Sequence, residues 1–144
     1  MIWALPSNES WMDGEGKDTD LWKRARRRRH FGGLVAEWIA AGWLALKGYR
    51  IIGRRVRTAG GEIDLIAVRR RRIAFIEVKQ RQYLAAAEAA IIPRQRHRVR
   101  KAAQLWLSKR DEFHAFEIGF DVVFLMPWRW PVHLENGLSD HESR

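Results

Sequence analysis

The sequence contains no cysteine. Without thiols the chain cannot form disulfides, thiolate metal sites or a cysteine nucleophile, and such a composition is typical of a reducing compartment. No apolar run approaches the ~18 residues that a membrane-spanning helix needs, and the first residues do not follow the basic-then-apolar order of a signal peptide. These absences predict a soluble, cytoplasmic protein that does not enter a membrane.

Two further absences narrow the class of protein. No Gly-Lys-Ser/Thr loop is present, so a nucleotide-driven motor is not indicated. The histidines lie far apart in sequence without metal-ligand spacing, and we expect them on the surface or on helix faces. They are His30, His97, His114, His133 and His141.

Acidic residues are scarce relative to basic ones. The chain carries 27 Lys and Arg against 17 Asp and Glu, a net charge of +10, and its pI is near 11.0. The excess is uneven, because the first 20 residues hold five acids and a single Lys, which leaves the rest still more basic. A field of this sign attracts polyanions and speeds their association. We therefore expect nucleic acid, and DNA first, as the partner.

The length of 144 residues predicts a single domain, since a chain of this size buries one core and not two. Residues 1–22 mix Gly, Pro, Ser and acids with isolated Trp and show no sustained period, which predicts a flexible lead-in. Residues 23–136 form the predicted nucleic-acid-binding domain, and residues 137–144 form a predicted tail.

The predicted domain alternates helical and strand-like segments. An almost wholly apolar stretch that stops at Gly48 predicts a buried helix, and three segments rich in β-branched residues predict strands. The predicted elements are a helix over 34–47, strands over 49–55, 61–69 and 72–79, a helix over 93–109, a strand over 120–126 and a short edge strand within 128–137. Residues 83–92 are rich in Ala without a marked face, so helix and loop both stay open for them.

Asp64 and Glu77 interrupt two of the predicted strands with charge. If residues 70–71 form the turn between these strands, Asp64 lies directly opposite Glu77, and the apolar neighbours of both acids share the other face. Two ionised carboxylates about 5 Å apart repel by roughly 3 kcal/mol at an effective dielectric near 20. The pair therefore needs something that offsets the repulsion.

Protonation of one acid would relieve the repulsion, and so would a bound divalent cation. In so basic a chain, a cation that also seeks phosphate, such as Mg²⁺, is the better interpretation. Lys79 lies two residues after Glu77 and hence on the same face of its strand, where an ammonium could hold an attacking water and offset charge on a phosphoryl oxygen. The alternative is a solvated ion cluster of Asp64, Glu77 and Lys79 without chemistry.

The motifs of this hairpin carry a family resemblance. The run GEIDLIA followed by FIEVKQR, with AEWIAAGWLALKGYRIIGRR upstream and FDVV downstream, resembles the YraN-like family of uncharacterised bacterial proteins. The spacing of Asp64 with Glu77, Val78 and Lys79 also resembles the signature of the PD-(D/E)XK nucleases. The resemblance extends from about Phe31 to Met126.

This resemblance implies a fold, a metal and a set of roles. The fold is an α/β restriction-endonuclease-like αβββαβ core, a mixed sheet flanked by helices, related to Holliday-junction resolvases. Asp64 and Glu77 would hold Mg²⁺ or Mn²⁺ together with the Val78 carbonyl. Lys79 would orient or activate water, and Glu37 of the first helix would stand at the outer edge of the metal. The related resolvases pair two subunits, so the resemblance is compatible with a homodimer.

Basic side chains around these motifs are the candidates for contacts with the phosphate backbone. Two positions depart from the family pattern, since Gln95 stands where it favours Lys and Gly119 where it favours Arg. The predicted nucleic-acid-binding residues are Arg54, Arg55, Arg57, Arg81, Arg94, Gln95 and Arg98.

Three functions remain open at the level of sequence. The first is a Mg²⁺-dependent endonuclease that acts on DNA, with branched or damaged structures as candidate substrates. The second is a nucleic-acid-binding protein that keeps the fold and the basic face without turnover. The third is an interaction subunit whose basic surface meets an acidic protein.

Overall fold

The computed structural model of the protein describes residues 32–82 and 93–138. The chain divides into two compact units, Met1–Leu34 and Val35–Arg144, and almost all described residues belong to the second. The predicted lead-in, the open segment 83–92 and most of the predicted tail lie outside the described residues.

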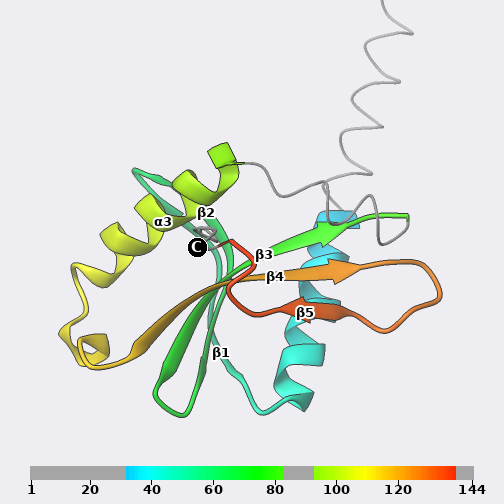
Figure 1. The fold of residues 1–144 in the computed structure, drawn as a ribbon, viewed down its shortest axis with the longest axis horizontal. Coiled ribbons are helices and arrows are strands. Elements are labelled where there is room, and N and C mark those ends of the chain that lie inside the picture. The colour runs from blue at the N-terminus through cyan, green and yellow to red at the C-terminus, as the bar shows by residue number, and fades with distance from the viewer. Residues whose placement is uncertain (1–31, 83–92, 139–144) are drawn as a thin grey trace, which may run out of the picture. The chain divides into compact units, whose positions relative to one another are not determined.

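Five strands form one sheet in the order β1-β2-β3-β4-β5 (Figure 1). The strands β3 and β4 pair in parallel and the other neighbours pair antiparallel, so the sheet is mixed. The strands are β1 Arg50–Thr58, β2 Gly61–Arg69, β3 Arg72–Gln80, β4 Glu117–Leu125 and β5 Val132–Leu134. Helical segments are residues 32–46, α3 Pro93–Leu107 and the short 3₁₀ helix η1 Asp111–Phe113. This order confirms the predicted αβββαβ core with helices flanking a mixed sheet.

The observed bounds differ from the predicted ones mainly at strand ends. The strand β2 has the predicted bounds, whereas β1 continues through Arg57 to Thr58 and β4 begins at Glu117 rather than 120. Both extensions mix polar and apolar residues without a clear strand pattern, but backbone pairing with β2 and with β3 continues through them. Pairing across the sheet thus overrides local polarity here.

Each face of the sheet is covered by one helix (Figure 1). Alternate residues along a strand point to opposite faces, and the buried residues separate accordingly into two clusters. The cyan helix at residues 32–46 packs through Ala40, Ala41 and Leu44 on Leu65, Ala67, Ala74, Ile76 and Val123. The yellow-green α3 packs through Val99, Ala102, Ala103 and Trp106 on Ile66, Val68, Ile73, Phe75, Val122 and Phe124.

A pair of glycines lets the turn between β1 and β2 approach α3. A Cβ at Gly60 would stand 3.0 Å from the backbone nitrogen of Ala102 and 2.9 Å from Cγ of Lys101. Gly61 has a φ of +141°, a conformation that residues with a side chain rarely adopt. The double glycine therefore brings the first half of α3 against the start of β2, where Asp64 lies.

A helix must be both long and apolar to cross the hydrocarbon core of a bilayer. Within residues 32–82 and 93–138, no helix is long and apolar enough to cross a membrane.

Candidate functional site: two acids and a lysine where the hairpin opens

The hairpin of β2 and β3 has the predicted register over its first half. Backbone pairs run from Arg69 with Arg72, next to the turn, to Leu65 with Ile76. The ladder stops there, one pair short of the predicted Asp64–Glu77 pair. In the continued register the N–H of Val78 would donate to a backbone carbonyl of β2. It donates instead to Oδ2 of Asp64, at 2.8 Å.

The alternation of side chains in β2 changes at the same point. Ile63 and Leu65 are two residues apart and would share one face of a regular strand. In the structure Ile63 packs with the α3 cluster and Leu65 with the cluster under the first helix. Asp64 thus marks the place where β2 departs from β3 and where a side chain takes over the role of a backbone acceptor.

A cavity of about 200 Å³ lies at this departure. Asp64 and Glu77 both line it, so the structure brings the two predicted acids to one space. The remaining lining residues are Gly61, Glu62, Arg98 and Val99, which come from the start of β2 and from the first half of α3. Arg98 is the predicted nucleic-acid-binding residue that reaches the rim of this cavity.

The electrostatics of the cavity oppose the charge of Asp64. Burial raises the pKa of Asp64 to about 7, and the neighbouring carboxylates of Glu77 and Glu37 act in the same direction. The hydrogen bond from the Val78 N–H lowers the pKa but does not outweigh these effects. The site therefore holds a carboxylate that is short of positive charge.

Lys79 forms an ion pair with Glu77. Its Nζ lies 3.5 Å from Oε1 of Glu77, and only 5% of the residue is exposed. A buried ammonium is costly unless it is paired, so this lysine is held in place by its partner rather than by solvent. Glu77 and Lys79 alternate with Val78, which points them to the same face of β3, as predicted.

Glu37 is buried rather than at an exposed edge of its helix, and its charge contributes to the raised pKa of Asp64. It is 6% exposed, and its Oε2 lies 2.9 Å from Nε of Arg55. Arg55 has a φ of +48°, which costs a non-glycine residue about 1–2 kcal/mol. The residue that pairs with Glu37 thus has a strained backbone, and such strain persists where the surroundings require it, often at functional sites.

The other predicted nucleic-acid-binding residues are spread more widely. Arg54 stacks on Trp38, and Arg57 forms an exposed pair with Glu62 at 3.3 Å. Arg81 lines a different cavity, next to Gln80 and Met126. Arg94 and Gln95 lie in the first turn of α3, but their side chains are outside the described residues.

The donors at the site can be compared with the needs of a metal ion. Within residues 32–82 and 93–138, no group of three or more His, Asp or Glu side chains is arranged to hold one. Mg²⁺ needs fewer, since it takes one or two carboxylates and keeps waters or phosphate oxygens. Asp64 and Glu77 supply two carboxylates, and the carbonyl of Val78 points to the same side of β3 as its N–H, toward Asp64. This all-oxygen donor set is of the kind that fits Mg²⁺ or Mn²⁺.

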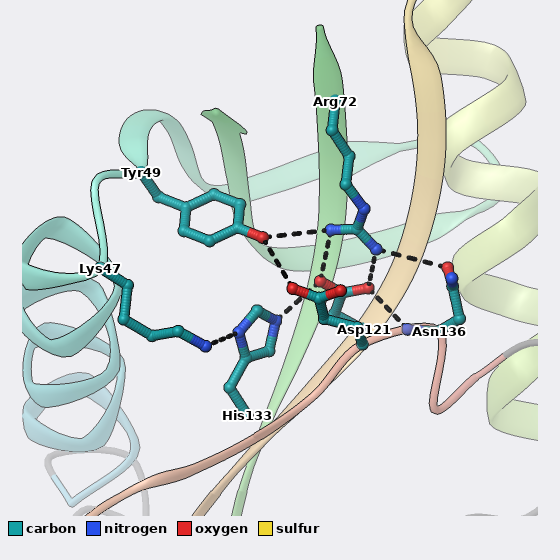
Figure 2. Close-up of polar contacts among 7 residues, drawn as sticks. Lys47, Tyr49, Arg72, Asp121, His133 and Asn136 are labelled. Atoms are coloured by element: carbon teal, nitrogen blue, oxygen red, sulfur yellow. Dashed lines mark hydrogen bonds and ion pairs between the residues drawn. The ribbon is translucent and has the colours of Figure 1, made fainter. Parts of the chain in front are cut away.

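Sequence reasoning missed a second buried polar cluster, around Asp121 of β4 (Figure 2). Arg72 donates to both carboxylate oxygens, at 2.7 and 2.8 Å, and the backbone N–H of Asn136 donates to Oδ1 at 2.9 Å. Nε2 of His133 lies 2.7 Å from Oδ2, and Nζ of Lys47 lies 2.7 Å from Nδ1 of the same ring. Because an ammonium only donates, Nδ1 accepts and Nε2 carries the proton toward Asp121.

These contacts correct one prediction and explain one departure. The His133 side chain is 1% exposed, so the expectation of a surface histidine was wrong, and a polar partner inside the apolar FDVV run was the signal to look for. Gly119 leaves the space that the Arg72 guanidinium fills on its way to Asp121, because a Cβ there would overlap Nη2 and Cζ of Arg72. The position thus serves the buried ion pair.

Comparison with known proteins gives one consistent result. Residues 36–125 match the model of the uncharacterised protein family UPF0102. A family protein from Maricaulis maris is 47% identical over 76% of this chain and 87% of its own length. Those from Mesorhizobium japonicum and Methylorubrum extorquens are 48% and 50% identical over 79% of this chain, and over 88% and 89% of their own lengths. The chain therefore belongs to the UPF0102 family, the YraN-like family that its hairpin motifs resemble.

Proposed function

We propose that this protein is a Mg²⁺-dependent nuclease that hydrolyses phosphodiester bonds of DNA. The observation that carries the proposal is the convergence of Asp64 and Glu77 on one cavity beside the buried ammonium of Lys79. A structural ion cluster would satisfy its charges, whereas burial and a second acid here raise the pKa of Asp64 to about 7. A divalent cation would relieve that excess of negative charge.

The residues divide the work as follows. Asp64, Glu77 and the Val78 carbonyl would hold the cation, which when bound would polarise a phosphoryl oxygen and lower the pKa of a water. Lys79, held by Glu77, would orient the attacking water and offset charge that grows on the phosphorus oxygens. Glu37, fixed by Arg55, would accept a hydrogen bond from water at the outer edge of the site.

The helix α3 supports an anionic substrate. Its first half is strongly basic, and its first turn contains no acid. Positive side chains near a helix N-terminus oppose the helix dipole, at about 0.3–1 kcal/mol each. A bound phosphate backbone would reverse this cost, and Arg98 already stands at the rim of the acid cavity.

The test is a cleavage panel of junction, flap, single-stranded and blunt duplex DNA with Mg²⁺ or Mn²⁺. Wild type should cut at least one substrate, and Asp64→Asn and Lys79→Ala should each lose about 10²-fold or more. Asp111→Asn, which changes an acid of η1 with no buried side chain, is the matched control and should cut normally. Equal rates for wild type, Asp64→Asn and Lys79→Ala would contradict the assignment.

A binding protein without turnover is the second candidate, favoured by the basic first half of α3, which needs no metal to attract DNA. This function predicts an affinity that falls steeply with salt and is unchanged or improved in Asp64→Asn. It also predicts no cleavage by any variant in the panel.

A further inference from the structure

An exposed tryptophan stands one residue from the acid site. Trp38 follows Glu37 in the first helix and is 62% exposed, although Trp is among the side chains that gain most from burial. The ring of Trp38 stacks with Arg54, and Glu37 pairs with Arg55, so two neighbouring residues of the first helix contact two neighbouring residues of β1. The ring therefore adjoins the ion pair of a predicted catalytic acid.

Arg54 covers one side of this ring. Its Cζ lies 3.5 Å from the centroid of the Trp38 ring, a close cation–π stack. A ring with one face covered that remains 62% exposed offers its other face to solvent. The stack also holds the indole plane fixed, which removes much of the entropy that a free side chain loses on binding.

The charge of Arg54 is not neutralised in the way that its neighbour's is. Arg55 forms an ion pair with Glu37, whereas the Trp38 ring is the partner of the Arg54 guanidinium within the described part of the chain. The buried Nε of Arg54 has no hydrogen-bond acceptor there. Trp38 and Arg54 thus combine a flat aromatic face with a positive charge that no acid of residues 32–82 or 93–138 pairs with, which is the chemistry that single-stranded nucleic acids bind.

We propose that Trp38, backed by Arg54, is a stacking platform for an unpaired nucleobase, so that the preferred substrate contains a single-stranded segment next to the bond that is cut. The part of this inference that concerns the bond that is cut rests on the proposed nuclease function. A duplex cannot offer a base face without unstacking, which costs a few kcal/mol, whereas a single strand, a flap or a junction arm can.

The experiment measures binding without cleavage, by fluorescence anisotropy in EDTA at one salt concentration. The probes are labelled oligothymidine, an abasic strand of the same length and a blunt duplex. Trp38→Ala should raise the Kd for oligothymidine about tenfold, since stacking contributes about 1–3 kcal/mol per base. Its Kd for the abasic strand and for the duplex should stay within about twofold of wild type.

Two variants control for folding and for aromatic content. Trp38→Phe should keep most of the affinity for oligothymidine, because every aromatic ring has a face for stacking. Trp128→Ala removes a fully exposed tryptophan that follows β4 and should change nothing. An unchanged Kd of Trp38→Ala for oligothymidine would overturn the platform, and so would an equal loss on all three probes.

The two proposals fail by different results. If wild type prefers oligothymidine through Trp38 but cuts nothing with Mg²⁺ or Mn²⁺, the stacking platform is supported and the nuclease function is contradicted. If wild type cuts DNA and the Trp38→Ala variant binds oligothymidine as tightly as wild type, the nuclease function is supported and the stacking platform is contradicted.

Discussion

Asp64 and Asp121 are two aspartates of the same sheet whose surroundings drive them in opposite directions. Burial raises the pKa of both, but at Asp121 the hydrogen bonds from Arg72 and His133 outweigh it and hold the pKa at about 2. At Asp64 the neighbours are acids, and the pKa rises to about 7. The difference separates a carboxylate whose partners include cationic side chains from one whose charged neighbours are acids.

This contrast favours a structural role for Asp121 and agrees with the metal-binding role proposed for Asp64. Asp121 is 0% exposed and ties β4 to Arg72 of β3, to His133 of β5 and to the turn that follows. Asp64 lines an open cavity and accepts a hydrogen bond from the backbone of Val78. Perturbed acids in cavities tend to be functional, and fully bonded ones tend to be structural.

The largest effect is expected at the satisfied acid. Asp121→Ala leaves the Arg72 guanidinium buried without its partner, and we expect a loss of about 3–5 kcal/mol in the free energy of unfolding. Urea denaturation would measure it. The double variant Arg72→Met with Asp121→Leu should recover most of the loss, because it removes both buried charges. A loss below about 1 kcal/mol in Asp121→Ala would contradict a structural role.

A smaller loss is expected where the same ion pair needs space. Gly119→Ala puts a methyl group where the Arg72 guanidinium lies, and we expect it to cost about 1–3 kcal/mol by overpacking. The matched control is Gly42→Ala in the first helix, where nothing lies within 4 Å of the added Cβ. That substitution should stabilise the protein by about 0.5–1 kcal/mol, since Ala favours a helix interior. Thermal unfolding would show the two shifts, and the same sign for both would contradict the reason given.

The smallest effect, with the opposite sign, is expected at the unsatisfied acid. Because the folded-state pKa of Asp64 lies above its ordinary value of 3.8, the folded state binds this proton more tightly and loses stability as pH rises from about 4 to about 7. Asp64→Asn keeps an oxygen for the Val78 N–H and should be about 1 kcal/mol more stable than wild type at pH 8 without metal, and equal to it near pH 4. Urea midpoints across this pH range would measure the difference.

Addition of Mg²⁺ gives a second test of whether Asp64 has a role different from that of Asp121. Mg²⁺ should raise the melting temperature of wild type at pH 8 and leave that of Asp64→Asn unchanged, since a ligand that binds the native state stabilises it. A strong loss of stability in metal-free Asp64→Asn, together with no response of wild type to Mg²⁺, would make Asp64 a second structural acid.

Much of the hairpin could be predicted, because side chains alternate between the two faces of a strand and the turn fixes which residues pair across it. The predicted turn at residues 70–71 sets the register, so the pairs from Arg69–Arg72 to Leu65–Ile76 follow from the position of the turn. The two-residue period of a strand placed Glu77 and Lys79 on one face of β3.

The rest depended on contacts that local patterns do not encode. The ladder stops at Asp64 because its side chain replaces a backbone acceptor. Such a hydrogen bond leaves no repeating pattern in the sequence from which it could be predicted. The Asp121 cluster joins residues from three strands and from the end of the first helix, including Lys47 and His133, which are 86 positions apart. The positive φ of Arg55 could not be predicted either, because residues other than Gly, Asn and Asp seldom adopt it.

The pairing of β3 has a mechanical consequence for the site. All nine residues of β3 pair with β4, including Glu77, Val78 and Lys79, whereas β2 leaves the ladder at Leu65. The start of β2 is held by β1 instead, through pairs that include Glu62 and Ile63 but not Asp64. A change in the radius of a bound ion should therefore displace Asp64 more than Glu77, and hydrogen exchange should be faster at the Asp64 amide than at the Glu77 amide.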